Sequence, residues 1–157
     1  MLLQTAKKTN GQNIVKISAE SLADNARAAS SRGLPPVHEW DPPDCGDIDI
    51  RIARDGTWFY LGTPIARPEI VRLFSTILRK DADRYVLVTP VEKVGISVDD
   101  APFLAVDFDH IDGSLRFMTS LGDQAIAGTD HPIRVARDPA TGEPAPYILV
   151  RGRLEAL

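Results

Sequence analysis

Glu92 is a carboxylate in a position from which it could do chemistry. It begins an alternating stretch in which it shares one side with Val94 and further apolar residues. A carboxylate on an apolar side is costly unless a cation meets it, and ionisable groups in such places are candidates for catalysis or ligand binding. Arg51 or Arg67 would have to approach it from elsewhere in the sequence. The other interpretation is a glutamate at the frayed start of a strand, exposed to water.

A denser group of potential metal ligands comes later, at Asp107, Asp109, His110 and Asp112. Carboxylate oxygens and imidazole nitrogens are common metal ligands. The calcium-loop spacing is not met, because Ile111 replaces an oxygen ligand and no glutamate closes the loop. The aspartates also alternate with apolar residues, as in any half-exposed strand that enters a turn. A metal site and a polar strand end are therefore both open.

Other side chains offer weaker signals. Asp99 and Asp100 are either ligand groups or ordinary turn formers before a proline. Trp58 and Tyr60 could stack on a planar ligand, or they belong to the core. Cys45 has an acidic neighbour and no second cysteine, so we expect a small buried packing role rather than a reactive thiolate.

Composition and missing motifs exclude several function classes. The 157 residues carry 18 basic and 22 acidic side chains, with no basic stripe for nucleic acid. A phosphate-binding loop, a dinucleotide fingerprint and a nucleophile elbow are absent, so no cofactor and no nucleotide hydrolysis by the usual machinery are predicted. One cysteine and no long apolar run favour the cytoplasm over export or a membrane.

The elements that must position these residues follow from periodicity and turn chemistry. Helices are predicted over 19–30, with Ser18 as the N-cap, and over 67–80, with Pro68 in the first turn. Between them, a Pro-rich connector over 33–46 leads to a strand in which Ile48 and its alternate neighbours point one way. Trp58 and Tyr60 follow on the partner strand, and this hairpin should be covered on both sides.

From residue 85 onward the pattern is that of strands alone. They are predicted near 85–89, 93–98, 103–108, 114–119, 124–127, 132–136 and 147–151, with an exposed loop over 138–146. Strands, one packed helix and a run of strands joined by short connections indicate an α+β fold with a mainly antiparallel sheet.

Two Asp-Gly turns divide the body of the chain into similar parts. Asp55-Gly56 and Asp112-Gly113 are each followed by a hydroxyl residue and a return strand, which is a strong hairpin signal. Each is also followed by a Gly-Thr step near Pro-Ile, which suggests a duplication; two independent hairpins are the alternative. We expect a tail over 1–17, a helix and connector over 18–46, and two lobes over 47–101 and 102–157 that form one compact unit.

Several longer motifs resemble one protein family. They are Cys45-Gly46-Asp47-Ile48-Asp49, Asp55-Gly56-Thr57-Trp58, Gly62-Thr63-Pro64-Ile65-Ala66-Arg67, Val71-x-Leu73-Phe74, Thr89-Pro90-Val91-Glu92-Lys93 and Asp99-Asp100-Ala101-Pro102-Phe103. Together they resemble the bacterial domain of unknown function 1285, from about residue 36 to 150. The resemblance implies a cytoplasmic α+β protein with a duplicated motif, whose second half is loosely similar to pleckstrin-homology-like folds. The family brings no established activity or catalytic residues.

The leading hypothesis is a non-enzymatic binding or sensor domain with a role in signal transduction. Its ligand would be a small, nucleotide-like molecule in a cleft between the lobes. The residues expected to line this cleft are Arg51, Trp58, Tyr60, Glu92, Lys93, Asp100 and Phe103. An enzyme that uses Glu92, or a metal held by Asp107, Asp109 and His110, is one alternative. A protein-interaction module working through sheet edges or the N-terminal helix is another, and no oligomeric state is predicted.

Overall fold

The computed structural model describes residues 18–30 and 33–157, so the predicted tail over 1–17 lies outside the described residues. The described residues contain two α-helices, α2 (Ala19–Ala29) and α3 (Pro68–Thr76), and one 3₁₀ turn, η1 (Val37–Glu39). The strands are β1 (Asp44–Ile52), β2 (Trp58–Tyr60), β3 (Thr63–Pro64), β4 (Leu78–Asp81), β5 (Arg84–Val88), β6 (Lys93–Val98), β7 (Ala105–Ile111), β8 (Ser114–Thr119), β9 (Gln124–Ile126), β10 (Ile133–Arg137), β11 (Pro144–Arg151) and β12 (Leu154–Ala156).

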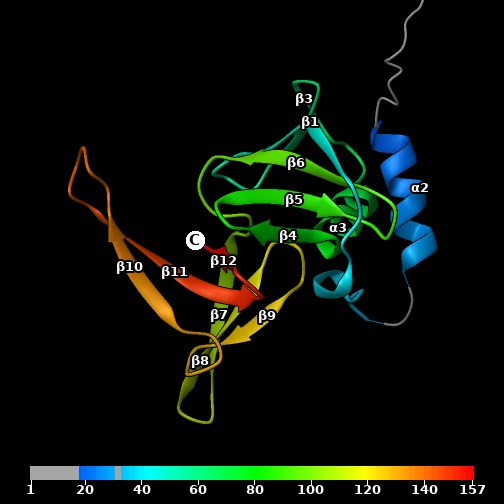
Figure 1. Cartoon of the computed structure of the whole chain (residues 1–157). Helices are drawn as coiled ribbons and strands as arrows, with labels where there is room; N and C mark the ends of the chain where they lie inside the picture. Colours follow the sequence, from blue (N-terminus) through cyan, green and yellow to red (C-terminus); the bar gives the residue numbers. More distant parts are fainter. Residues whose placement is uncertain (1–17, 31–32) are drawn as a thin grey trace, which may run out of the picture.

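The first half of the chain forms one six-stranded sheet in the order β3-β2-β1-β6-β5-β4. The pair β1–β6 is parallel, with Arg51 opposite Ser97, and the other pairs are antiparallel. Strand β4 therefore forms an edge of this sheet. The expected α+β fold with a mainly antiparallel sheet is confirmed (Figure 1).

The second half repeats this strand order. The sheets β7-β8-β9 and β10-β11-β12 are joined by a parallel bridge between Phe103, two residues before β7, and Ala156 of β12. Placed side by side through this bridge, the strands follow the order β9-β8-β7-β12-β11-β10, which corresponds to that of the first half, with a single parallel bridge in place of the central β1–β6 pair. The two halves thus share one topology, as the paired Asp-Gly turns suggested. They differ between the third and fourth strands, where the first half has α3 and the second has a loop over 127–132.

Both helices lie together on one side of the first sheet (Figure 1). Helix α2 begins at the predicted N-cap Ser18, whose side chain accepts a hydrogen bond from the backbone of Ser21 in a capping box. Pro68 starts α3, where a missing N–H costs nothing. Phe74 of α3 is fully buried and its ring centroid lies 6.4 Å from that of Trp58. The core of the first half therefore forms between the helices and one sheet face.

Helix α3 is shorter than the 67–80 that the sequence predicted. Residues 78–81 form strand β4, in which Leu78 pairs with Leu87 of β5. Leu78 suits both periods: it continues the apolar face of the helix, and as an apolar residue followed by the polar Arg79 it also fits the alternation of a strand. The pairing with β5 uses backbone groups that lie elsewhere in the sequence, and it outweighs the local helical pattern. The helix prediction was wrong over this last turn.

Other strand boundaries also differ from those predicted, because the strand that pairs with each one determines where it begins and ends. Strand β11 starts at Pro144, three residues before the predicted start, since Ala136 and Arg137 of β10 pair with its first residues. Strand β12 was not predicted as a separate element. The hairpin around Asp55 is not covered on both sides, because Leu61 is 65% exposed. The similarity of the second half to pleckstrin-homology-like folds stays a prediction.

Phe74→Ala tests the proposed core of the first half. The change leaves a cavity between α3 and Trp58, so we expect the free energy of unfolding to fall by about 3–5 kcal/mol. Urea denaturation measures this value. Leu61→Ala removes an equally apolar but exposed side chain and should change stability by less than about 0.5 kcal/mol. Equal effects of the two substitutions would contradict the assignment.

Candidate functional site

A cleft of about 780 Å³ opens between the two halves, beside the edge strand β4. Three segments wall it: the Pro-rich connector over 34–41, strand β4 with the residues before it, and the turn between β11 and β12 over 151–154. We call it the β4 cleft. The first two walls belong to the first half and the third to the second half, so the cleft lies where the lobes meet.

The β4 cleft is rich in cations although the protein is acidic. Its lining includes four cationic side chains, those of Arg79, Lys80, Arg151 and Arg153. Two carboxylates also line it, Asp41 and Asp81, whereas the whole chain has a net charge of −4. The cleft is therefore a local reversal of the overall charge, and what each cation already contacts decides which could bind a ligand.

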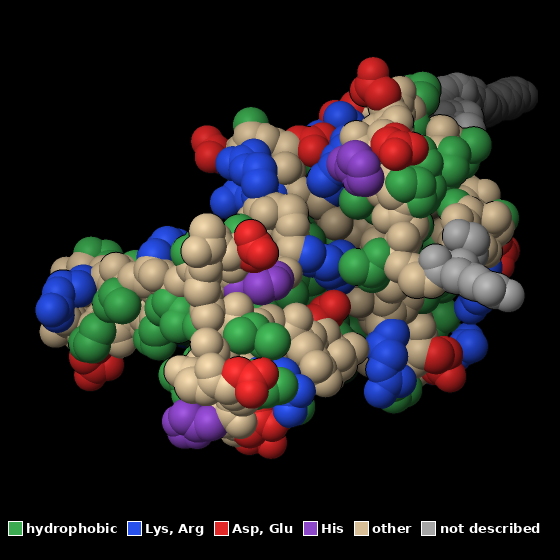
Figure 2. Space-filling view, turned by 90° about the horizontal axis from the view of Figure 1, so that it is seen from below, with side chains coloured by type: hydrophobic (Ala, Val, Ile, Leu, Met, Phe, Trp, Pro, Cys, Tyr) green, Lys and Arg blue, Asp and Glu red, His purple; other side chains and the backbone are tan. Residues whose placement is uncertain are grey.

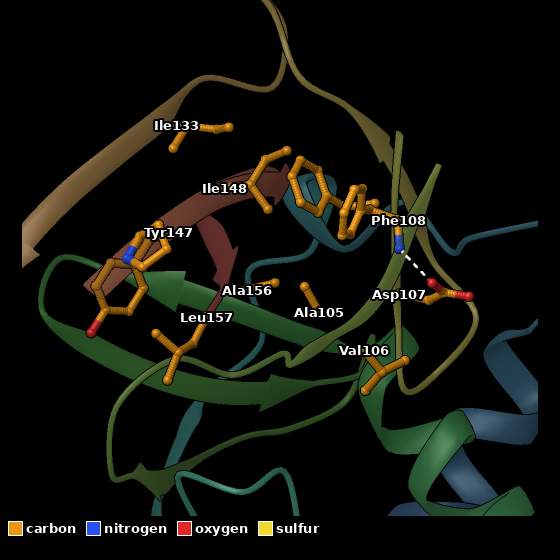
Figure 3. A pocket seen from close by; sticks show the side chains of 11 residues that line it. Ala105, Val106, Asp107, Phe108, Ile133, Tyr147, Ile148, Ala156 and Leu157 are labelled. Carbon is orange, nitrogen blue, oxygen red and sulfur yellow. Dashed lines mark hydrogen bonds between the residues drawn. The ribbon is translucent and has the colours of Figure 1, made fainter. Parts of the chain in front are cut away.

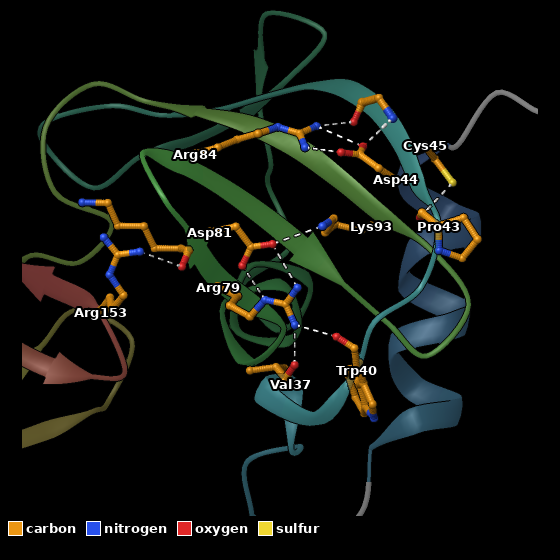
Figure 4. A network of polar contacts seen from close by, with 12 residues as sticks. Val37, Trp40, Pro43, Asp44, Cys45, Arg79, Asp81, Arg84, Lys93 and Arg153 are labelled. Atoms are coloured by element: carbon orange, nitrogen blue, oxygen red, sulfur yellow. Dashed lines mark hydrogen bonds and ion pairs between the residues drawn. The ribbon is translucent and has the colours of Figure 1, made fainter.

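Arg79 is fully occupied as a structural clamp (Figure 4). Its Nε and Nη2 donate to the two oxygens of Asp81 at 2.7 and 3.0 Å. Its Nη1 donates to the carbonyls of Val37 and Trp40 at 2.6 and 2.8 Å. Lys93 adds an ion pair with Asp81 at 3.2 Å. This network fastens the connector to β4 and so builds one wall of the cleft.

The same network perturbs the Asp81 carboxyl. The hydrogen bond from Arg79 lowers the pKa of Asp81 below its ordinary value, and Lys93 adds to that effect, while partial burial opposes it. Asp81 therefore stays ionised. Arg79 and Lys93 neutralise its charge, so this carboxylate is not available to bind a ligand.

Arg151 joins the second half to the first. Its Nη2 donates to the carbonyl of Ser75, in the last turn of α3, at 2.7 Å, where the helix dipole favours a cation. The guanidinium lies 4.9 Å from the centroid of Phe103, and its Nε is 3.6 Å from Asp123 without a hydrogen bond. Burial lowers the pKa of Arg151, against the pull of Asp123. This side chain is committed to the contact between the lobes.

Lys80 and Arg153 are different, because neither is within ion-pair distance of a carboxylate in the described part of the chain. The Lys80 ammonium lies 5.2 Å from the centroid of Tyr85, and Arg153 makes one long hydrogen bond, at 3.4 Å, to the Lys80 carbonyl. One cation comes from each half. They are the charges that the β4 cleft has available.

The backbone of β4 adds donors to the same place. Val88 donates to the carbonyl of Ile77 at 2.9 Å, and bonding alternates along an antiparallel pair. The N–H groups of Leu78 and Lys80 therefore face away from β5, toward the cleft. An edge strand of this kind can bind an extended chain or an anion through its free backbone groups.

The aromatic residues of the predicted site are part of the framework. Trp58 and Phe103 are each only 2% exposed and belong to the core. The Tyr60 hydroxyl accepts a hydrogen bond from the backbone of Ala19 at 3.4 Å and so helps to seat α2. Of the two interpretations of Trp58 and Tyr60, the structure supports the core.

The charged residues of the predicted site lie apart from one another. Arg51 forms an ion pair with Asp99 and covers the ring of Phe59. Asp100 accepts from the Tyr147 hydroxyl at 2.6 Å and pairs with Arg54 at 3.3 Å, which links the lobes on another side. Lys93 does not line the β4 cleft itself, but it forms an ion pair with Asp81, which does. A ligand role for these residues stays a prediction.

Glu92 is buried, at 3% exposure, so the expectation of a water-exposed glutamate is corrected. Its oxygens accept hydrogen bonds from the Asn25 amide of α2 at 2.9 and 3.1 Å and from the Thr89 hydroxyl at 2.8 Å. The donors are neutral, and the two arginines considered from the sequence pair with carboxylates elsewhere. Glu92 therefore fastens α2 to the rest of the protein. The sequence did not predict this contact, because its partner Asn25 lies 67 residues away.

The metal-ligand candidates are also separated. Asp109 is held by Arg116 through hydrogen bonds at 2.6 and 3.0 Å, and Asp107 accepts from the backbone of Phe108. Within residues 18–30 and 33–157, no group of three or more His, Cys, Asp or Glu is placed to hold a metal ion. Cys45 is an exposed residue, so the expected buried packing role is corrected.

Sequence reasoning missed the residues that make the β4 cleft. Lys80 was assigned to a helix end, where a cation needs no further explanation. Arg153 stands in a turn, and Trp40 lies in the Pro-rich connector, which was predicted without a binding role. The signal that the sequence did contain was a Pro-rich connector carrying an aromatic side chain.

Comparisons with known proteins give the same family for both halves of the chain. A family model described as "Domain of unknown function (DUF1285), N-terminal domain" matches residues 35–101, and its C-terminal counterpart matches residues 102–157. A crystal structure of a DUF1285 family protein from Silicibacter pomeroyi DSS-3 is 63% identical, with a TM-score of 0.79, over 86% of this chain and 76% of that one. A second crystal structure, of a DUF1285 family protein from Shewanella baltica OS155, is 33% identical, with a TM-score of 0.55. The match covers 68% of this chain and 80% of that one. No curated protein matches.

Asn25→Ala tests the role of Glu92. The substitution leaves a buried carboxylate without two of its hydrogen bonds, so we expect a loss of about 1–3 kcal/mol in unfolding free energy and faster amide exchange in α2. Asp24→Ala on the same helix is the matched control, because that side chain is 76% exposed, and its effect should be below about 0.5 kcal/mol. No difference between the two variants would refute this role.

Asp81→Asn tests the clamp through pH. Because the folded-state pKa of Asp81 is lowered, its carboxylate stabilises the protein above the unfolded pKa of about 3.9, and this contribution is lost as the pH falls through the folded pKa. The variant should be less stable at neutral pH and should lose less stability below about pH 4. Unfolding at a series of pH values measures both. A variant whose acid profile is unchanged would argue against the clamp.

Proposed function

The chain belongs to the DUF1285 family, whose description assigns no function, and on this premise we propose that it is a binding module whose β4 cleft takes a small anionic ligand. One observation carries the proposal: Lys80 and Arg153 line the same cleft, come from different halves, and have no carboxylate partner among the described residues. In an acidic protein, where most other arginines are paired, two such cations favour an anion.

The remaining lining favours a nucleotide-like ligand. Trp40 and His38 offer ring faces on which a planar group could stack. A cleft of about 780 Å³ is within the size range of small-molecule sites. Because the phosphate-binding loop is absent, the anion would be bound by Lys80, Arg153 and the free N–H groups of β4. A ligand with a planar ring and a phosphate satisfies both parts of the lining.

Binding at this place has a mechanical consequence. Lys80 belongs to the first half and Arg153 to the second, so an anion that contacts both would add a further link between the halves. Such a ligand would stabilise the arrangement of the halves that the contacts of Arg151 already hold. We therefore propose a non-enzymatic sensor with a role in signal transduction in the cytoplasm. Within the described residues no helix is long and apolar enough to cross a membrane.

Ligand titration tests the proposal with inorganic pyrophosphate, AMP and GMP as probes. We expect at least one of them to raise the thermal midpoint and to quench Trp40, while Trp58 stays buried in the core. The double variant Lys80→Ala, Arg153→Ala should weaken binding by at least about tenfold, because it removes both unpaired charges. Isothermal titration calorimetry measures the dissociation constants.

Arg72→Ala is the matched control, because Arg72 is an exposed cation of α3 outside the cleft lining. It should leave the dissociation constant unchanged. If none of the three probes stabilises the unmutated protein, or if the double variant binds as well as the control, the proposal fails.

A further inference from the structure

Asp41 lines the β4 cleft but has no part in the anion site proposed above. It is exposed, and in the part of the chain that the structure describes its carboxylate forms neither an ion pair nor a hydrogen bond. The other carboxylate of the lining, Asp81, is neutralised by Arg79 and Lys93. Asp41 is therefore a hydrogen-bond acceptor that the cleft has available for a ligand.

An unpaired carboxylate is informative here because the charges around it are mixed. Figure 2 shows acidic and basic side chains interspersed over the face of the molecule that it presents, without a large patch of one sign among the described residues. Distant exposed charges are screened by salt. What Asp41 can bind is therefore decided by its neighbours in the cleft rather than by the field of the whole protein.

A second hollow of about 380 Å³, between β7 and the hairpin β10–β11, offers no comparable group (Figure 3). Its lining is mainly apolar and includes Phe108. Its one carboxylate, that of Asp107, points away from the hollow and accepts a hydrogen bond from the backbone of Phe108 at 2.8 Å. The Tyr147 hydroxyl, which also belongs to the lining, donates to Asp100 at 2.6 Å. A polar ligand therefore finds more partners in the β4 cleft.

The backbone on both sides of Asp41 is fixed. The carbonyl of Trp40 before it accepts a hydrogen bond from Arg79 at 2.8 Å, and Pro42 after it is buried. A residue that precedes a proline is also restricted to extended conformations. Because this segment is ordered before a ligand arrives, Asp41 can form hydrogen bonds with little further loss of conformational entropy.

The available cations and the aromatic side chain of the connector lie in different parts of the cleft. Figure 4 shows Arg153 and Trp40 on opposite sides of Arg79. A nucleotide with its phosphate at Lys80 and Arg153 would therefore place its base toward Trp40. Asp41 follows this ring directly in the chain, and its negative charge disfavours the reverse orientation, which would bring the phosphate to it. The edge of the base is then the group that meets Asp41.

A carboxylate distinguishes bases by the hydrogen atoms on their edges, because it accepts hydrogen bonds and does not donate them. Guanine presents two neighbouring donors, N1–H and the N2 amino group, which match the two oxygens of one carboxylate. Adenine and cytosine present an amino group beside a ring nitrogen whose lone pair repels a carboxylate, and uracil has one donor between two carbonyls. Of these four bases, guanine alone satisfies both oxygens.

We propose that the ligand of the β4 cleft is a guanine nucleotide and that Asp41 selects the guanine base. This inference rests on the proposed function, because it adds a base to the phosphate site of Lys80 and Arg153. In this arrangement Trp40 supplies the stacking surface and the two cations bind the phosphate. Asp41 supplies the specificity, since a site built to hydrogen-bond a donor discriminates against a ligand that lacks it.

Calorimetric titration of the full chain with GMP, IMP and AMP tests the assignment. We expect GMP to bind at least about tenfold more tightly than AMP, because hydrogen bonds to a charged group are lost with adenine. IMP keeps N1–H but lacks the N2 amino group, so its affinity should fall between the two. Asp41→Asn should weaken GMP and strengthen AMP, because an amide both donates and accepts and so matches the alternating edge of adenine.

Glu39→Gln is the matched control, because it removes a negative charge from an exposed side chain of the same connector outside the cleft lining. It should leave the ratio of the GMP and AMP dissociation constants unchanged, which separates hydrogen bonding by Asp41 from a general effect of charge. Thermal midpoints verify that both variants are folded, as expected for substitutions at exposed positions.

Two results would overturn the guanine assignment and leave the anion site intact. One is equal affinity of the unmutated protein for GMP and AMP. The other is an equal loss of affinity for both nucleotides in Asp41→Asn, which would place the carboxylate on the ribose that they share. If neither pyrophosphate nor any of the nucleotides binds, the proposed function itself fails, and the guanine assignment fails with it.

Discussion

In each half of this protein the segment that begins the half pairs in parallel with the segment that ends it: β1 pairs with β6, and Phe103, just before β7, bridges to Ala156 of β12. The other elements are arranged around these contacts. Parallel neighbours cannot be joined by a tight turn, so the chain between β1 and β6 must leave the sheet and return. In doing so it adds β2 and β3 on one side and β5 and β4 on the other. The order makes β4 an edge strand. The β4 cleft exists because this edge faces the second half rather than another strand.

The same pairing explains why the two halves have different surfaces. In the first half the return path contains α3, so Phe74 and Trp58 are buried between helix and sheet. In the second half the path contains a short loop, and several large apolar residues of β7 and β10, among them Phe108 and Ile133, remain exposed. One topology thus produces a closed core in one half and an open groove in the other. Arg151 then binds the halves together at the end of α3.

Most charged residues of the described chain are paired with an opposite charge and have a structural role, whereas a few have no such partner and can bind a ligand. The carboxylates of Asp81, Asp99 and Asp109 are each held by an arginine. Such pairs have little net effect on stability when they are exposed, but they fix the positions of neighbouring segments, as Arg79 does for the connector. Lys80 and Arg153 are left without carboxylates, and for that reason they characterise the site better than the more numerous paired charges do.

The sequence by itself determined the local elements. Ser18 and Pro68 began helices where expected, Asp55-Gly56 and Asp112-Gly113 made turns, and alternation located most strands, because each signal lies within a few residues of its effect. Only the tertiary structure decided that residues 78–81 join a sheet, that Asn25 meets a buried Glu92, and that Lys80 and Arg153 share a cleft. The physical reason is that partners far apart in sequence, brought together by strand register, decide which groups are paired, buried or free.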